Sequence, residues 1–482
     1  MHPLTLVATV LCVVAIVSSR VAVKAAPSTS IVRRASDDDG GLSKDSALTD
    51  SQVTSIKGIL NRTASLSWEI GTHLEALVEY DTPALGPYAA SFDSVSPSTS
   101  PVPYNVLEIV SYISNNNPPS SDQLQIVRDG SAADPASIAP FYVLANWTLE
   151  GGAGSNDVLP TNSSGTTGVG KARLQESVEN QVTALLERTP RTSDGAISHR
   201  TDSTELWSDF VYMVPPFLAY YGVMTKNTSM LDDAYNQCKL YRQYLRDDRT
   251  GLWRHIAMGD SPDPGLWSTG NGWAANGMLR TLSSLRESSY KDDYSDQTND
   301  LVSWVGEIVT GAWAQPQSGG LLYNYLNETS SFADCSGTAL LSAATFRLAT
   351  VISNHSSSTA LTAAERAYQT VTSTSHLSTP QAVLHPVVNP MDYSSELTNV
   401  KLDASGKVSP EGEAFVLLME SARRDWIRGG GDVGSLGVAS NGNSGGGGGS
   451  GAGSTRVDRT VLVASLGTGV LGLLASTLLA SA

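Results

Sequence analysis

The sequence predicts an all-α fold built from helical hairpins. Apolar residues recur three and four positions apart in residues 74–78, 231–245 and 414–421, the spacing that places side chains on one face of a helix. Alternating patterns typical of strands are scarce. Polar loops with a glycine recur at intervals of about one helical hairpin. These observations favour stacked hairpins, which can close into a ring.

The folded part of the chain is expected over residues 51–428. Residues 1–26 hold an apolar run followed by small residues at Ala25 and Ala26, which is the pattern of a secretory signal peptide. A membrane span is the alternative, but the run is short for one. Residues 27–50 are rich in Ser, Asp and Gly and are predicted to be disordered.

The C-terminal end has the pattern of a glycosylphosphatidylinositol attachment signal. Residues 429–460 form a Gly/Ser-rich linker, and residues 461–482 are apolar and carry no charge. Attachment is expected near Ser450, Gly451 or Ala452. The alternative is a retained single-pass helix of about 22 residues. The chain is therefore expected in the secretory pathway, on the outer face of the plasma membrane or in a cell wall.

Composition narrows the range of partners. The formal net charge of -16 argues against a nucleic acid. Sequons for N-glycosylation agree with a secretory route; they lie at Asn61, Asn146, Asn162, Asn227, Asn327 and Asn354. Once a signal peptide is removed, Cys238 and Cys335 remain, and these either form a disulfide or stay as two buried thiols.

Three loops share one pattern, in which a polar turn, a glycine and apolar residues lead to a histidine or tyrosine. They occupy residues 191–199, 249–255 and 317–325. A fainter copy, Asp129-Gly130, precedes Asp134. Helix starts are expected after each loop. If the hairpins close into a ring, such loops gather at one end and line a pocket.

Asp209 is the leading catalytic candidate. It lies between Trp207 and Tyr212 at the start of an apolar run, and His199 lies shortly upstream. Aromatic side chains stack on sugar faces, and an apolar environment raises a carboxyl pKa so that the group can carry a proton near neutral pH. The alternative is that Asp209 only caps a helix. Pro215-Pro216 should kink or restart that helix.

An ordered series of motifs resembles a known family. The series is PRTSDG…SH…LWSDFVYM…PFLAYYG, then TGLWRH, LWSTGNGW and SGGLLYNYL…SGTALL. It resembles the unsaturated glucuronyl and rhamnogalacturonyl hydrolases, the six-hairpin glycosidases of glycoside hydrolase families 88 and 105. The similarity covers about residues 60–426 and is densest over 183–347. It implies a single (α/α)6 barrel with its site at the loop end.

The resemblance also implies residue roles. Asp209 would protonate the C4=C5 bond of a terminal unsaturated uronic acid and then help water add at C5. Asp134 matches the second aspartate, although a helix cap followed by Pro135 is an alternative reading. Substrate contacts are expected from His199, Trp207, Tyr212, His255, Trp267, Asn271 and Trp273. Structural roles in turns or the core are the alternative for the histidines and for Trp267 and Trp273. No cofactor or metal is expected, because the histidines lack the close spacing of metal ligands.

One departure from the family concerns substrate binding. Thr269 stands where the family has an arginine that is expected to hold the uronate carboxylate, and Arg200 or Arg254 is a candidate to replace it. The predicted function is a secreted or cell-surface glycoside hydrolase acting on acidic oligosaccharides. The alternatives are another (α/α)6 cell-wall glycan hydrolase or transglycosidase, such as a mannan enzyme, and a non-catalytic carbohydrate-binding wall protein. Asp232-Asp233 resembles the paired aspartates of mannan enzymes, but its place at a helix start predicts a helix-dipole role.

Overall fold

The structure is a computed structural model that describes residues 48–95, 102–150, 158–159, 168–352, 358–398 and 408–438. The predicted signal peptide, most of the Gly/Ser linker and the C-terminal apolar tail lie outside these residues, as do Asn162 and Asn354. Among the described helices, none has the length and apolar character needed to cross a membrane.

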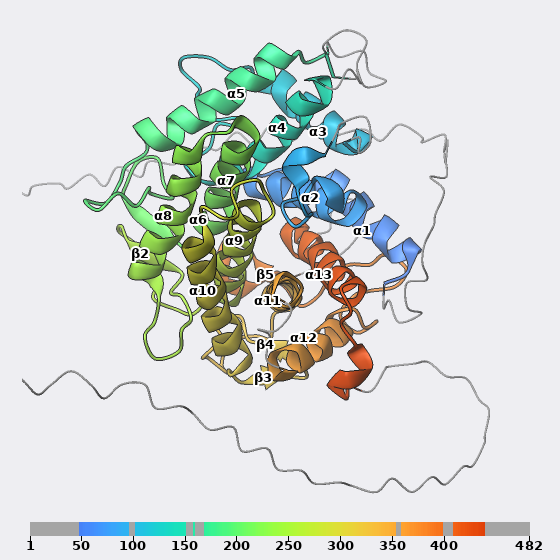
Figure 1. Ribbon diagram of the computed structural model, residues 1–482. Coiled ribbons are helices and arrows are strands. Elements are labelled where there is room, and N and C mark those ends of the chain that lie inside the picture. The colour runs from blue at the N-terminus through green and yellow to red at the C-terminus, as the bar shows by residue number, and fades with distance from the viewer. Residues whose placement is uncertain are drawn as a thin grey trace, which may run out of the picture. The chain divides into compact units, whose positions relative to one another are not determined.

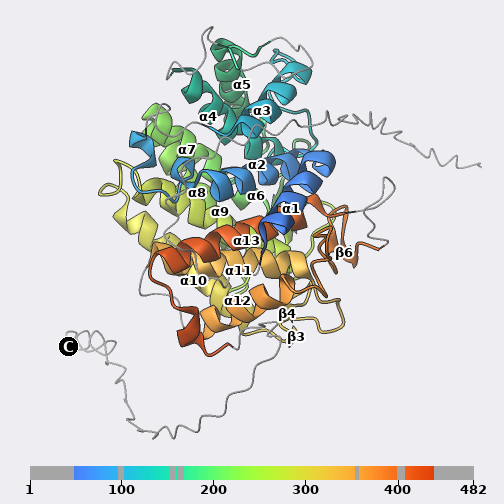
Figure 2. The ribbon, with the colours of Figure 1, turned by 90° about the vertical axis from the view of Figure 1, so that its right-hand side faces the viewer.

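The described chain forms six helical hairpins, each with an outer and an inner member (Figures 1 and 2). The outer helices are α1 (Asp50–Thr63), α3 (Tyr104–Asn116), α5 (Lys171–Thr183), α8 (Thr228–Leu245), α10 (Ser295–Trp313) and α12 (Ser358–Val371). The inner helices are α2 (Ser67–Asp81), α4 (Ala139–Glu150), α6 (Phe210–Met213) with α7 (Pro215–Thr225), α9 (Ser268–Arg286), α11 (Cys335–Val351) and α13 (Pro410–Arg428).

The inner helices close into a ring. Going round it, α2 packs on α13, α13 on α11, α11 on α9, α9 on α7 and α7 on α4; η3 (Asp134–Ile138), the turn that leads into α4, packs back on α2. Figure 2 shows α11, α12 and α13 running side by side. The predicted (α/α)6 barrel is therefore confirmed, and so are the helices expected from apolar spacing, now α2, α8 and α13.

Short antiparallel sheets join the loops that precede the inner helices. Strand β1 (Glu205–Trp207) pairs with β2 (Ile256–Met258), with Leu206 opposite Ala257. Strand β3 (Gln317–Ser318) pairs with β4 (Leu321–Leu322), and β5 (Val388–Asn389) pairs with β6 (Asp392–Glu396). The remaining short elements are η1 (Pro83–Leu85), η2 (Phe92–Ser94), η4 (Ala184–Arg188) and η5 (Val433–Leu436).

The recurrent loops lie together at one end of the ring, as predicted. Each of the three leads toward the start of an inner helix, namely α6, α9 or α11. Backbone bridges connect loops of different hairpins, for example Ser131 with Arg200 and Trp267 with Tyr325. Since all inner helices start at this end, their N-terminal peptide dipoles point their positive ends toward one region.

Two local features test the sequence interpretation. As expected, Pro215-Pro216 restarts the helix, because α6 ends at Met213 and α7 begins at Pro215. The Gly270-Asn271-Gly272 segment, which the sequence suggested to be a turn, lies inside α9. A Cβ atom on Gly270 would overlap the Ser208 hydroxyl. The glycine therefore allows close packing of a helix rather than a reversal of the chain.

Two further observations concern the cysteines and the end of the fold. Cys238 on α8 and Cys335 at the start of α11 are buried free thiols, which decides between the two alternatives left open by the sequence. The linker was expected from residue 429, yet Val433–Leu436 form the turn η5, and the Thr362 hydroxyl lies 3.4 Å from the Leu436 carbonyl oxygen.

Candidate active site

Asp209 stands between β1 and α6. Its Oδ2 accepts a hydrogen bond from the Ser208 hydroxyl at 3.0 Å and lies 3.6 Å from His255 Nε2. The Asp209 side chain makes no capping hydrogen bond to α6, although it precedes that helix. Only 15% of the side chain is exposed. Burial raises the pKa of the Asp209 carboxyl, and the charge of His255 opposes this rise.

Asp134 is the first residue of η3 and is buried. Its Oδ1 lies 3.6 Å from His199 Nε2, which lies 3.2 Å from the Ser131 hydroxyl. Burial, followed by the charges of Asp129 and Asp209, raises the pKa of Asp134 well above its usual value. The fold therefore brings the two predicted catalytic aspartates close enough for their charges to interact.

Trp207 separates the two histidines of the site. The His199 ring stacks on the indole with centroids 4.8 Å apart, and His255 meets its edge at 5.6 Å. The indole Nε1 donates to Glu205 Oε2 at 2.9 Å, which holds the ring in this orientation. Burial lowers the pKa of His199 to about 3, so this imidazole is neutral at physiological pH.

Aromatic rings and a carboxylate surround His255. Trp267 and Tyr393 each lie 4.5 Å from it between ring centroids. Its Nδ1 lies 3.0 Å from Asp263 Oδ2. Asp263 and Tyr393 were not predicted from the sequence. Asp263 follows His255 on the same loop without a distinctive motif, and Tyr393 comes from β6, far along the chain.

Two aromatic residues expected to contact substrate, Tyr212 and Trp273, lie in the core instead. The Tyr212 ring packs on Trp273 at 4.3 Å, and the Arg280 guanidinium lies 4.5 Å from its centroid. Trp273 is 1% exposed and also meets Phe415. Their positions among α6, α9 and α13 give these rings a packing role.

Asn271 likewise has a structural role. Its Oδ1 accepts from the Trp253 backbone N–H at 2.8 Å. Its Nδ2 donates to the carbonyl oxygens of Trp253 and Trp267, both at 2.9 Å. Both donors and one acceptor site of the amide are engaged, so Asn271 fixes the loop that carries His255 rather than facing a ligand.

The two arginines that could replace the family arginine occupy different places. Arg200 covers Gly130, where a Cβ atom would come within 2.9 Å of its guanidinium, and its charge opposes the raised pKa of Asp134. Arg254 instead pairs with Asp247 at 3.8 Å. Thr269 is fully buried, and among the described residues its hydroxyl has no hydrogen-bond partner.

A further buried carboxyl group lies near Asp209. Glu411 occupies the first turn of α13, and its Oε2 accepts from Trp68 Nε1 at 2.9 Å. Burial, together with the charges of Glu69, Asp209 and Asp334, raises the pKa of Glu411 to about 8. The site thus gathers carboxyl groups whose pKa values are raised by burial, which suits general acid and base chemistry.

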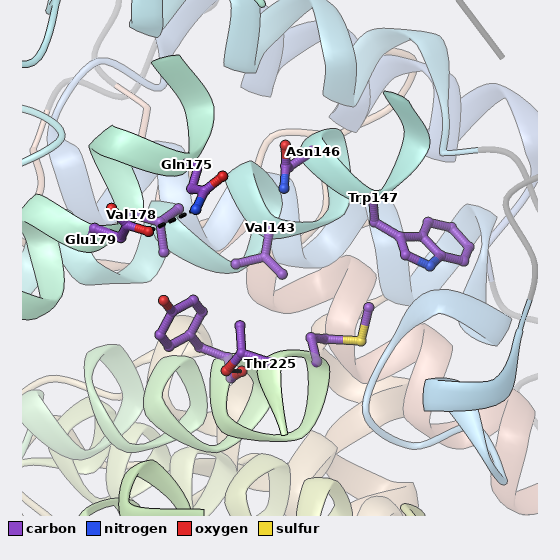
Figure 3. A pocket seen from close by; sticks show the side chains of 9 residues that line it. Val143, Asn146, Trp147, Gln175, Val178, Glu179 and Thr225 are labelled. Carbon is purple, nitrogen blue, oxygen red and sulfur yellow. Dashed lines mark hydrogen bonds between the residues drawn. The ribbon is translucent and has the colours of Figure 1, made fainter. Parts of the chain in front are cut away.

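Other candidate features lie elsewhere. Asp232 belongs to the outer helix α8, where its Oδ1 accepts from the Tyr294 hydroxyl at 2.9 Å. A cavity of about 200 Å³ lies between α4, α5 and α7; Figure 3 shows Val143, Gln175 and Thr225 among its lining residues. Neither catalytic aspartate lines it. In the described ranges, no three His, Cys, Asp or Glu side chains gather as metal ligands.

Comparison with known proteins agrees with this fold. Residues 166–389 match the sequence model of Glycosyl Hydrolase Family 88. A family 105 glycoside hydrolase from C. acetobutylicum is 14% identical, with 79% of this chain and 99% of that chain covered and a TM-score of 0.55. A possible family 105 member from Klebsiella pneumoniae is 15% identical, with 78% and 92% covered and a TM-score of 0.53.

The unsaturated glucuronyl hydrolase of Bacillus sp. GL1 shares the same fold. It is 12% identical, with 77% of this chain and 94% of that chain covered and a TM-score of 0.51. At these identities the solved structures establish the fold, while the family match covers the segment that holds His199, Asp209 and His255. The chain therefore has the fold of these glycosidases and carries a segment similar to Glycosyl Hydrolase Family 88, which supports a glycoside hydrolase.

Proposed function

We propose that the protein removes a terminal unsaturated uronic acid from acidic oligosaccharides by hydrating its C4=C5 double bond. The observation that carries this proposal is the pair of buried aspartates, Asp134 and Asp209, each facing its own histidine across 3.6 Å. Burial raises the pKa of both carboxyl groups, which favours the protonated form that an alkene needs as a proton donor.

The reaction divides into two proton transfers. Asp209, protonated at the start, donates its proton to C4, and positive charge develops at C5 and the ring oxygen. Water then adds to C5 while the Asp209 carboxylate takes its proton. The resulting hemiketal at C5 opens and releases the neighbouring sugar. One water molecule is consumed, and Asp209 returns to its starting state.

The remaining site residues hold the sugar and the charge. Asp134 is buried, and its pKa lies well above the usual value for a carboxyl group. It serves as a hydrogen-bond donor toward a sugar oxygen. Trp207 and Trp267 offer ring surfaces on either side of His255 for stacking on the sugar. Because Thr269 stands where the family has an arginine, the uronate carboxylate needs another partner, and Arg200 is the basic side chain beside Asp134.

Turnover of lyase-generated unsaturated galacturonyl and glucuronyl oligosaccharides tests the proposal. The wild type is expected to abolish the ultraviolet absorbance of the conjugated double bond. Asp209→Asn should lower kcat by about a thousandfold, because an amide cannot donate the proton. Asp232→Asn on the outer helix is the matched control and should retain wild-type rates. A wild type without turnover on every such substrate would contradict the proposal.

The role of Arg200 has its own test. Arg200→Ala should raise KM for a uronyl substrate about tenfold or more, since it removes a charge-assisted contact, whereas Arg254→Ala should not. The comparison is informative because each arginine pairs with an aspartate at 3.8 Å, Arg200 with Asp202 and Arg254 with Asp247, but the charge of Arg200 acts on Asp134. If both variants keep the wild-type KM, the carboxylate is held in another way.

We also propose that the enzyme acts at the cell surface after secretion. The terminal segments expected to direct secretion and lipid attachment support this, and Asn61, Asn227 and Asn327 are exposed and open to glycosylation. In a eukaryotic host, phosphatidylinositol-specific phospholipase C should release the full-length protein from the surface. Retention in the membrane after this treatment would favour the single-pass helix.

A further inference from the structure

His255 stands between two carboxylates. Its Nδ1 lies 3.0 Å from Asp263 Oδ2, and its Nε2 lies 3.6 Å from Asp209 Oδ2. The imidazole is 1% exposed, so water does not compete for these contacts. The contact at Nδ1 is a hydrogen bond, whereas Nε2 makes none with the described residues and faces Asp209.

Asp263 is fixed in place and ionised. Its Oδ1 accepts from the Gly265 backbone N–H at 2.9 Å, and its Oδ2 accepts from the Tyr325 hydroxyl at 2.8 Å. Its backbone pairs with that of Ile256 in both directions. Burial alone would raise the pKa of Asp263, but the hydrogen bonds from His255, Gly265 and Tyr325 hold it below its usual value.

His199, the other histidine of the site, lacks such a partner. Its Nδ1 is buried and makes no hydrogen bond within the part of the chain that the structure describes. Its Nε2 faces Ser131 and Asp134, and burial keeps the ring neutral. Among the described residues each histidine has one ring nitrogen without a hydrogen bond, Nδ1 in His199 and Nε2 in His255, and the other nitrogen meets a hydroxyl in His199 but a carboxylate in His255.

We propose that Asp263 is a positioning residue that holds the His255 ring with its Nε2 directed at Asp209. This inference rests on the proposed function, because it places His255 beside the carboxyl group that donates the proton. Asp263 itself touches no substrate in this scheme. It acts by accepting a hydrogen bond from His255 Nδ1 and so fixing the ring orientation.

Every charged or titratable group that faces His255 enters this balance. Asp209 and Asp263 lie at its nitrogens, Tyr393 of β6 meets its ring, and the charge of His255 also acts on His199. Tyr325 acts through Asp263. When Asp263 is replaced, the His255 ring is no longer fixed and opposes the effect of burial on Asp209 less strongly, while the Ser208 hydrogen bond remains. The pKa of Asp209 then rises further, and the acid becomes weaker.

Asp263→Asn tests the inference, and Asp260→Asn, an exposed site on the same loop, is the matched control. We expect kcat to fall about tenfold or more with KM nearly unchanged, because the proton transfer is affected and not binding. The alkaline limb of the kcat profile should move to higher pH, since it reports deprotonation of Asp209. Tyr325→Phe should move that limb the other way, because it leaves Asp263 a stronger base.

A second measurement does not depend on catalysis. In the full-length protein with labelled histidines, the His255 resonances, assigned with His255→Gln, should show an Nδ1–H protected from exchange with solvent in the wild type and unprotected in Asp263→Asn. If the Nδ1–H is equally protected in both, or if Asp263→Asn and Asp260→Asn give the same pH profile, the inference is overturned. If the Nδ1–H behaves as expected but no unsaturated substrate turns over, the proposed function fails and the positioning role of Asp263 stands.

Discussion

Two aspartates of similar chemistry are placed in different surroundings by the fold. Asp134 lies near two further carboxylates, Asp129 and Asp209, and its pKa rises well above the usual value. Asp209 has the charge of His255 beside it, which limits the rise caused by burial. Such a difference separates a carboxyl group that stays neutral from one that gives and takes a proton.

Asp134→Asn should preserve the fold and impair catalysis. Burial raises the pKa of the carboxyl group and so disfavours its charge, and an uncharged amide should therefore not lower the free energy of unfolding at neutral pH. We expect kcat to fall about a hundredfold, because the amide cannot share a proton with Asp209 or His199. Asp122→Asn, an exposed change on the same loop, is the control. Full activity of Asp134→Asn in a steady-state assay would exclude Asp134 from catalysis.

Glu413 should make stability depend on pH. It is fully buried, its Oε1 accepts from the Leu384 N–H at 2.8 Å, and burial raises its pKa to about 8. A carboxyl group whose pKa is higher in the folded state favours folding at low pH. Its contribution is complete below the unfolded value near 4.5 and is lost as the pH rises through about 8.

Glu413→Gln should therefore flatten the stability profile between these two pH values. At pH 8 the variant is expected to exceed the wild type in free energy of unfolding by a few kcal/mol, at roughly 1.4 kcal/mol per unit of pKa shift. Denaturant unfolding at several pH values measures the difference. Glu328→Gln at an exposed loop position should keep the wild-type slope. Parallel curves for wild type and Glu413→Gln would contradict the expectation.

At the level of elements, close contact between inner helices places the catalytic residues. Gly277 of α9 faces the backbone of α6, and a Cβ atom there would overlap the Val211 carbonyl oxygen. Gly272 similarly approaches Leu340 of α11 within 2.9 Å of a hypothetical Cβ. Apolar spacing could predict that α9 is a helix, although its glycines are typical of a turn. Their packing role could not be predicted, because it depends on neighbours distant in the chain.

Gly277→Ala should separate α9 from α6 and displace Asp209. We expect a loss of roughly 3 kcal/mol or more in stability, since a backbone atom cannot yield as a side chain can. Gly306→Ala on the outer helix α10 is the matched control. A Cβ atom there meets no atom within 4 Å, so it should stabilise the protein by about 0.5–1 kcal/mol through helix propensity. Thermal unfolding measures both, and equal melting temperatures would contradict the packing argument.

At the scale of the whole molecule, buried ion pairs connect the inner helices. Glu79 of α2 accepts from Arg280 of α9 at 2.9 Å and from Arg347 of α11 at 3.0 Å. Arg347 also pairs with Asp425 of α13. Although burial would raise the pKa of Glu79, the two arginine charges lower it and keep the group ionised. These contacts tie together helices from four of the six hairpins.

Glu79→Gln should destabilise the ring. Removing this charge leaves two buried guanidinium groups with fewer partners, which costs about 3–5 kcal/mol. Asp81→Asn removes the exposed partner of Lys57 and should cost at most about 1 kcal/mol. Chemical denaturation compares the two variants. A loss for Glu79→Gln no larger than that for Asp81→Asn would show that the ring does not depend on this cluster.

The sequence by itself determined the helical class and the recurring loops, and it predicted Asp134, Asp209, His199 and His255 as site residues, because these depend on local spacing and on motifs contiguous in the chain. The tertiary structure alone decided which aromatic residues face the site. It moved Tyr212, Asn271 and Trp273 into the core and brought Asp263, Tyr325 and Tyr393 to His255. The reason is that a side chain's direction depends on how separate helices and loops pack. The spacing of residues along one segment carries no information about the segments that pack against it.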